Sequence, residues 1–215
     1  MHPVVVLHFD ETYFYQKKLI NSAIQIDLRN IGKKFICDEH TLRLIESKIP
    51  KINYFICFIG KGEYHYVSFV LLKRLRFPFV LTVVDNHLDM KYSEKGFVRC
   101  DSWVYWAAKL KNVKRIYFIN SSNIKRIFKT YLPVYMSIDK DILDKKYLNT
   151  RWTQGNVSLE ELCNFIYYFF KKNTLLGIDI CGEPDFEDLE EIKKSEKINL
   201  TILNCLSLKS VKKSA

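Results

Sequence analysis

The chain has 215 residues, of which 48% are hydrophobic and 27% are charged, so it carries enough apolar sequence to bury the core of one domain. This composition excludes a disordered tail, a collagen and a small scaffold held by disulfides. Lysine and arginine number 34 against 24 aspartate and glutamate residues, and the net charge of +10 favours anionic partners without identifying one.

Neither the cysteines nor the apolar runs point to secretion or to a membrane. The six cysteines are scattered without a Cys-x-x-Cys pair, so we expect reduced thiols that mostly fill the core. The first residues, MHPVVVLHFDET, lack the basic segment and the cleavage site of a secretion signal. No apolar run reaches the roughly 18 to 20 residues that cross a bilayer. We therefore expect a soluble, cytoplasmic protein with no membrane partner.

Short apolar runs alternate with helical patterns along the chain. In chain order, the predicted elements are strand Val4–His8, helix Glu39–Lys48, strand Tyr54–Ile59, helix Tyr66–Arg74, strand Phe79–Val84, helix Ser102–Leu110, strands Arg115–Ile119 and Val134–Ile138, helix Ser158–Lys171, strand Leu175–Ile180, helix Asp185–Ser195 and strand Leu200–Leu203. Most of the strands are almost continuously apolar, which is typical of parallel strands covered by helices on both faces.

This alternation predicts the fold class and the domain organisation. We expect an α/β fold, a three-layer α/β/α sandwich with a mainly parallel central sheet. The sequence contains no internal repeat and no linker rich in glycine or proline, so a single domain over residues 1–215 is predicted. The polar and basic segment Ser207–Ala215 is expected to be a frayed terminus.

Acidic and imidazole side chains follow three of the predicted strands, at the edge where the carboxyl ends of parallel strands meet. They are His65, then Asp85, His87 and Asp89, then Asp139 and Asp141. Alternate residues of an extended segment face the same side, so these six side chains are expected to converge. Four carboxylates in one small site need cations to neutralise them. Oxygen and imidazole ligands suit a hard or borderline ion, and six of them are enough for two manganese ions.

The same residues fall into motifs whose order and context resemble the ureohydrolases, the superfamily of arginases, agmatinases and formiminoglutamases. The motifs are Gly60-x-Gly62-x-x-His65, Asp85-x-His87-x-Asp89 and Ser137-x-Asp139-x-Asp141. The resemblance extends over roughly residues 54–183 and includes Asp179-Ile180-Cys181-Gly182-Glu183, which is similar to a small, little-characterised branch of the superfamily. It implies an arginase-like fold.

The resemblance also implies a binuclear manganese site. One ion would be held by His65, Asp85, Asp89 and Asp139, and the second by Asp85, His87, Asp139 and Asp141. The implied activity is hydrolysis of a linear, non-peptide C–N bond of guanidino, amidino or formimino type, in a small-molecule substrate that the sequence does not identify.

Two acidic residues are the predicted catalytic groups. Asp89 would accept a proton and return it to the departing amine. Glu183 follows a further predicted strand, where the larger enzymes place an acid that grips the substrate. The alternative for Glu183 is an acid that complements the N-terminus of the following helix.

The chain departs from the larger enzymes at one catalytic position. They have a histidine between the second and third motifs that shuttles protons, whereas the five histidines here are His2, His8, His40, His65 and His87. The alternative function is therefore a non-catalytic, metal-binding member of the fold that acts as a binding or structural protein. A nucleic-acid-binding domain is a third hypothesis, but we expect the basic clusters to be a solvated rim. A homo-oligomer is left open.

Overall fold

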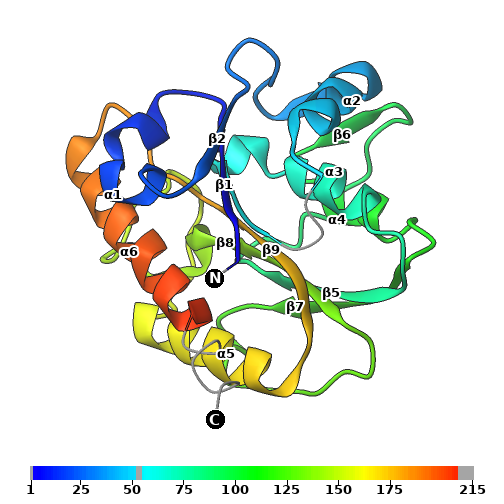
Figure 1. The fold of residues 1–215 in the computed structure, drawn as a ribbon. Helices are drawn as coiled ribbons and strands as arrows, with labels where there is room; N and C mark the ends of the chain where they lie inside the picture. Colours follow the sequence, from blue (N-terminus) through cyan, green and yellow to red (C-terminus); the bar gives the residue numbers. More distant parts are fainter. Residues whose placement is uncertain (1, 52–54, 208–215) are drawn as a thin grey trace.

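The structure, a computed structural model, describes residues 2–51 and 55–207. Its centre is a seven-stranded sheet in the order β2-β1-β4-β9-β8-β5-β7, in which every described pairing is parallel (Figure 1). In chain order the strands of this sheet are β1 (Val4–His8), β2 (Ile24–Asp27), β4 (Ile56–Gly60), β5 (Phe79–Val84), β7 (Val113–Ile119), β8 (Val134–Asp139) and β9 (Leu175–Cys181). The predicted parallel sheet is confirmed.

Helices cover both faces of this sheet, which confirms the three layers (Figure 1). One face carries α2 (Glu39–Lys48), α3 (Val67–Lys73) and α4 (Trp103–Ala107). The other face carries α1 (Lys17–Ile20), α5 (Leu159–Lys172) and α6 (Leu189–Ser207). Single turns of 3-10 helix occupy η1 (Thr12–Tyr15), η2 (Gly62–Tyr64) and η3 (Lys140–Ile142).

Alternate residues of β1 illustrate how the sheet separates two hydrophobic cores. Val5 and Leu7 pack into the core under α2, α3 and α4, whereas Val6 packs into the core under α5 and α6. All three are at most 1% exposed, and full burial of such a side chain stabilises the fold by about 1.5–3 kcal/mol. Burial on both faces explains why the central strands read as continuous apolar runs.

Helix α5 forms where the sequence provides both ends of a helix. The Ser158 side chain accepts a hydrogen bond from the Glu161 amide, and the Glu161 side chain accepts one from the Ser158 amide, which together make a capping box. Two lysines occupy the last turn, where they complement the helix dipole. The predicted helix Ser158–Lys171 is confirmed to within one residue at each end.

The last predicted strand, Leu200–Leu203, is wrong, because these residues belong to α6. This helix begins at Leu189, later than the predicted start at Asp185, and continues to Ser207. Ile198, Ile202 and Leu206 are buried at a spacing of four residues, which places them on one helix face. A four-residue apolar run fits a buried helix segment as well as a strand, so the run by itself does not distinguish the two.

Three short strands were not predicted. Strand β2, at the edge of the sheet, is mostly exposed, and β3 (Ile36–Asp38) pairs with β6 (Phe97–Arg99) in a separate antiparallel sheet. These segments lack the apolar runs that marked the central strands. Tyr54 of the predicted strand Tyr54–Ile59 and residues 208–215 of the predicted frayed terminus lie outside the described residues.

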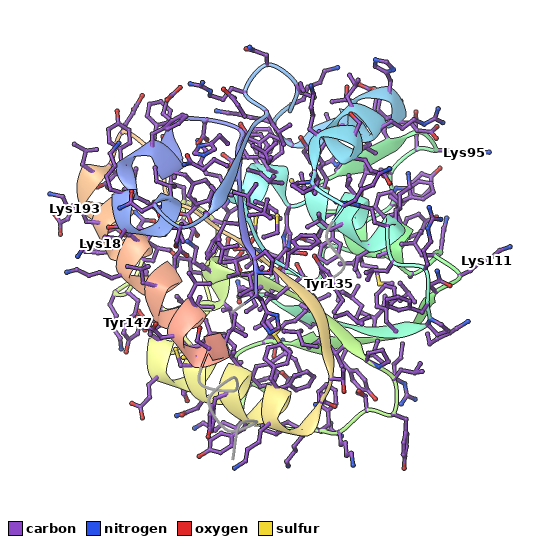
Figure 2. All side chains as sticks on the ribbon, in the orientation of Figure 1. Lys18, Lys95, Lys111, Tyr135, Tyr147 and Lys193 are labelled. Carbon is purple, nitrogen blue, oxygen red and sulfur yellow. The ribbon has the colours of Figure 1, made fainter. Side chains whose placement is uncertain are left out.

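The surface lysines are spread over the molecule. Figure 2 shows Lys18 and Lys193 projecting from one side and Lys95 and Lys111 from the opposite side, and all four are exposed. The positive net charge is therefore not confined to one face. Among the described residues, no helix has the length and the hydropathy of a membrane span.

Candidate metal centre

The candidate site lies where neighbouring parallel strands end. Strands β4, β9, β8 and β5 are adjacent in that order, so their carboxyl ends meet at one edge of the sheet. The pairing register places Asp139, the last residue of β8, beside Cys181, the last residue of β9. Asp85 directly follows β5, and its amide donates a hydrogen bond to the Ile119 carbonyl at 3.0 Å.

A cavity of about 530 Å³ opens at this edge. Its lining includes all six predicted metal ligands, namely His65, Asp85, His87, Asp89, Asp139 and Asp141. Asp85, Asp139 and Asp141 are at most 4% exposed, whereas the His87 side chain is 35% exposed. The carboxylates therefore form the base of the cavity, and His87 lies towards its opening. The structure brings together the side chains that the strand-end motifs single out.

Three carboxylates surround His65. This residue follows the turn η2 and is 2% exposed. Its Nδ1 lies 3.0 Å from Asp89 Oδ2, 3.3 Å from Asp139 Oδ2 and 3.6 Å from Asp85 Oδ2. One ring nitrogen and three carboxylate oxygens thus face one another, which is a donor set suited to a divalent cation.

A second group of ligand atoms forms around His87. Its Nδ1 lies 2.6 Å from Asp141 Oδ2 and 3.8 Å from Asp85 Oδ1. Asp85 therefore takes part in both groups, with Oδ2 towards His65 and Oδ1 towards His87. The ligand atoms of Asp85, His87 and Asp141 lie within 4.8 Å of one another, close enough to share an ion.

The carboxylates of this centre are held in an environment that disfavours their charge. Burial, together with the charges of Asp141, Asp139 and Asp89, raises the pKa of Asp85 well above its usual value. Burial and the charge of Asp141 likewise raise the pKa of Asp139 to about 7. Asp85 Oδ2 is buried and accepts no hydrogen bond from the described residues. The cluster thus lacks neutralising charge, which bound cations or protons would provide.

The pKa of His65 is raised as well, and for an imidazole a raised pKa favours the charged form. Burial by itself would lower the pKa of His65, but the hydrogen bond to Asp89 and the charges of Asp89, Asp139 and Asp179 outweigh burial and raise it to about 9. The imidazole therefore carries a proton at neutral pH while no other cation is bound. A metal ion at this position has to displace that proton.

A buried acid orients the His65 ring from behind. His65 Nε2 lies 3.1 Å from the Ser137 hydroxyl, which donates a hydrogen bond to Asp179 Oδ1 at 2.6 Å. Ser68 donates a second hydrogen bond to the same oxygen at 2.9 Å. Such contacts to the distal ring nitrogen fix the orientation and the tautomer of a metal-binding histidine.

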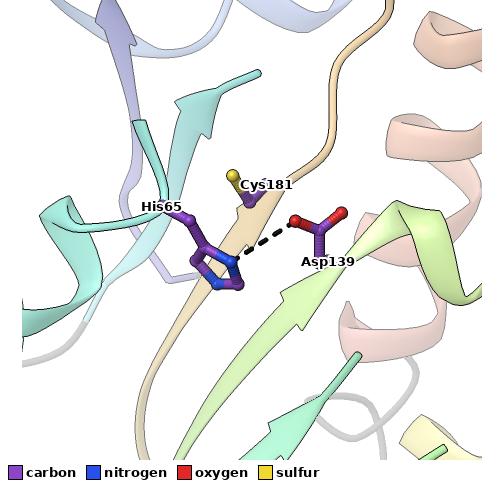
Figure 3. Close-up of side chains that lie close together, drawn as sticks. All are labelled: His65, Asp139 and Cys181. Atoms are coloured by element: carbon purple, nitrogen blue, oxygen red, sulfur yellow. Dashed lines mark ion pairs between the residues drawn. The ribbon is translucent and has the colours of Figure 1, made fainter. Parts of the chain in front are cut away.

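Cys181 also lies beside these ligand-type side chains, although the cysteines were expected mainly to fill the core. Figure 3 shows Cys181 beside His65 and Asp139, and the ligand atoms of these three residues lie within 4.8 Å of one another. The Cys181 thiol donates a hydrogen bond to the Lys61 carbonyl at 3.2 Å. Cys181 follows Asp179 by two residues on β9, so the two side chains lie on the same face of the sheet. This spacing is the sequence signal for the position of Cys181.

Glu183 lies elsewhere. Its side chain is fully buried and forms an ion pair with Lys140, and it is not among the described residues that line the cavity. Gly182, immediately before it, has a φ of +83°, a left-handed conformation that favours glycine and redirects the chain. An ideal Cβ at Gly182 would overlap Asp139 Oδ1. The segment thus passes directly against the candidate metal centre, while Glu183 is not part of the cavity lining.

Comparison with other sequences gives one clear relative. An uncharacterized protein of Thermotoga maritima is 34% identical over 217 residues, which cover 94% of this chain and 88% of that protein. No protein-family model matches the chain.

Comparison with solved structures gives the ureohydrolase fold. Bacillus subtilis formimidoylglutamase has a TM-score of 0.64 at 12% identity, with 97% of this chain and 88% of that chain covered. Entamoeba histolytica arginase in complex with L-ornithine has a TM-score of 0.66 at 16% identity, with 96% and 98% covered. Trypanosoma cruzi formiminoglutamase with Mn²⁺ has a TM-score of 0.68 at 11% identity, with 96% and 93% covered. The chain therefore belongs to the family of the Thermotoga maritima protein, and its fold is that of the arginases and formiminoglutamases.

Proposed function

We propose that this protein is a cytoplasmic hydrolase that uses two manganese ions to cleave a linear, non-peptide C–N bond in a guanidino, amidino or formimino compound. The observation that carries the proposal is the convergence of six ligand-type side chains in one cavity. The structural neighbours with this fold include an arginase and formiminoglutamases, which supports the reaction class.

The side chains present fit two divalent cations. His65, Asp85, Asp89 and Asp139 would hold one ion, and Asp85, His87, Asp139 and Asp141 would hold the other. The unsatisfied Oδ2 of Asp85 and the raised pKa of Asp139 both indicate that the cluster lacks positive charge. Mixed carboxylate and imidazole ligation suits a hard or borderline divalent ion such as manganese.

Asp89 is the proposed proton carrier. When bound, the ions would lower the pKa of a water molecule so that it attacks at neutral pH. Asp89 Oδ2 accepts a hydrogen bond from Trp103 Nε1 at 2.9 Å, which orients the carboxylate towards His65. The carboxylate would take the proton of the attacking water and return it to the departing amine. The backbone of Asp89 has a φ of +49°, so its position is imposed by the surrounding structure.

The wall of the cavity provides apolar side chains that would contact the part of a small substrate beyond the reacting C–N bond. Leu88, Met90 and Trp152 line it together with the ligands. Trp152 packs against Gly62 so closely that an ideal Cβ there would lie 2.6 Å from the indole Nε1. Glycine at this position therefore lets the indole form part of the wall.

Metal analysis combined with a substrate panel tests the proposal. Protein loaded with manganese should contain two ions per chain and should release urea, ammonia or an amine from one class of guanidino, amidino or formimino compound. Asp139→Ala is expected to lose both metal and turnover, because it removes a ligand common to the two ions. Asp27→Ala, on the exposed strand β2, is the matched control and should retain both. An Asp139→Ala variant with two manganese ions and full activity would contradict the assignment.

The alternative is a metal-binding protein of this fold without catalysis. It is favoured by the absence of a histidine between residues 89 and 139, where the larger enzymes resembled by this sequence have their proton shuttle. In that case the same experiment yields bound manganese but no turnover across the whole panel.

A further inference from the structure

A buried ion pair lies directly behind the candidate metal centre. Lys140 stands between the two predicted ligands Asp139 and Asp141, and it pairs with Glu183. The side chains of Lys140 and Glu183 are both 0% exposed. Buried charges of this kind are rare because desolvation is costly, so a fully buried pair requires an explanation.

Lys140 uses all of its hydrogen-bonding capacity in this position. Besides Glu183, its ammonium donates to Ser195 Oγ at 2.6 Å and to Asn199 Oδ1 at 3.0 Å. An ammonium group has three protons, and each has an acceptor here. Ser195 and Asn199 are four residues apart on α6 and therefore share one helix face.

Glu183 is held in the same way. It accepts hydrogen bonds from Ser195 Oγ at 2.7 Å, from Asn199 Nδ2 at 2.8 Å and from Gln16 Nε2 at 2.6 Å. The network therefore ties the residue after β8, the segment after β9 and one face of α6 together. Figure 3 shows α6 beside the turn that follows Asp139.

We propose that Lys140 and Glu183 are a positioning pair, which anchors the Asp139–Asp141 segment to α6 so that both aspartates face the cavity. The inference rests on the proposed function, because it concerns the ligands of the proposed metal site. Asp139 and Asp141 line the cavity, whereas Lys140 points to the opposite side into the network. The Asp141 amide donates to Asp139 Oδ1 at 2.9 Å, so a hydrogen bond links the two aspartates on either side of Lys140.

Two physical arguments favour positioning over simple stabilisation. Replacing a buried ion pair by neutral side chains often leaves stability unchanged or increases it, so stability alone does not require the pair. The positive charge of Lys140 would also repel a cation bound at Asp139. Glu183 neutralises that charge by pairing directly with the ammonium group. Both arguments predict that the pair affects the metal site more than the fold.

Manganese binding by variants tests the inference. The neutral double variant K140M/E183Q keeps the volume of both side chains, and the amide groups of Gln16 and Asn199 can still donate to residue 183, so it should fold. Its manganese Kd should rise about 10- to 100-fold. Ser195→Ala removes one contact to each member of the pair and should raise the Kd in the same direction by a smaller factor. The matched control is Asn173→Ala, at the opposite edge of the sheet, where the buried amide bonds to Thr130 and Phe128. This control should lower the melting temperature without changing the Kd.

Hydrogen exchange of the metal-free protein separates this inference from the proposed function. In K140M/E183Q, peptides that cover residues 139–143 should exchange faster than in the wild type, whereas peptides from α5 should not. If the wild type binds no manganese, the proposed function fails, but faster exchange confined to 139–143 still supports the positioning role. Unchanged exchange in that segment, or an unchanged Kd in a double variant that binds manganese, would overturn the inference.

Discussion

Manganese affinity should increase steeply with pH, because protons occupy the ligands of the metal-free centre. Metal ligands have to be deprotonated, so a cation competes with any proton that the apo site retains. Asp139 has a pKa of about 7 and His65 a pKa of about 9 in the absence of metal. Both values lie above those of the free side chains, so the affinity should be weak in mild acid and should strengthen as the pH rises.

The size of the effect follows from these two values. Between pH 6 and pH 8 the ionised fraction of Asp139 rises about tenfold, and the neutral fraction of His65 rises about 100-fold. Together they amount to about three decades in the manganese Kd, or about 4 kcal/mol. A site whose ligands had the pKa values of free side chains would change by only a few-fold in this range, through its histidines.

Electron paramagnetic resonance of free Mn²⁺, measured at pH 6, 7 and 8, gives the Kd directly. His40→Asn is the matched control, because His40 is exposed on α2 and is not among the described residues that line the cavity, so its loss should leave the slope unchanged. Asp139→Asn should reduce both the affinity and the slope. A manganese Kd that is constant between pH 6 and pH 8 would refute the reasoning about proton competition.

Three further substitutions test individual contacts. Ser137→Ala removes the hydroxyl that contacts His65 Nε2 and should raise the manganese Kd about 10- to 100-fold; an unchanged Kd would argue against orientation of the ring by this contact. Gly182→Ala places a Cβ against the last residue of β8 and should cost clearly more unfolding free energy than Gly96→Ala, which has a similar φ but open space; equal losses in urea denaturation would show that the contact is unimportant. Ile202→Ala should lower the free energy of unfolding by about 2–5 kcal/mol, and a loss below 1 kcal/mol would contradict core packing of α6.

The convergence of the six side chains was predictable because each of them lies close to the end of a strand. Asp85, His87 and Asp89 sit in one short segment, and parallel strands bring the carboxyl ends of distant segments to one edge without further information. The direction of Glu183 was not predictable, because it depends on the positive φ of Gly182. Glycine permits this conformation but does not require it, so sequence alone does not show which way the next side chain points.

The secondary structure likewise contains elements that the local sequence predicts and elements that it does not. The buried central strands have a distinctive composition, because both faces contact helices and most positions are apolar. Strand β2 reads Ile-Gln-Ile-Asp and is paired on one side only within the sheet, so its residues face mostly water. Leu200–Leu203 is apolar for a different reason, because it belongs to a helix packed on α5 as well as on the sheet. Only the tertiary contacts distinguish these cases.

The distribution of cations explains why the centre requires charge from outside the chain. The protein carries a net charge of +10, yet Lys91 is the single lysine or arginine among the described residues that line the cavity, and it lies 3.3 Å from Asp101. Two buried lysines lie beside the centre, and each is paired elsewhere, Lys140 with Glu183 and Lys61 with Asp10. Four carboxylates therefore converge without a compensating side chain, apart from the histidines. Since a buried cluster of like charges is unfavourable, protons or divalent ions have to neutralise it, and their competition is what the pH dependence measures.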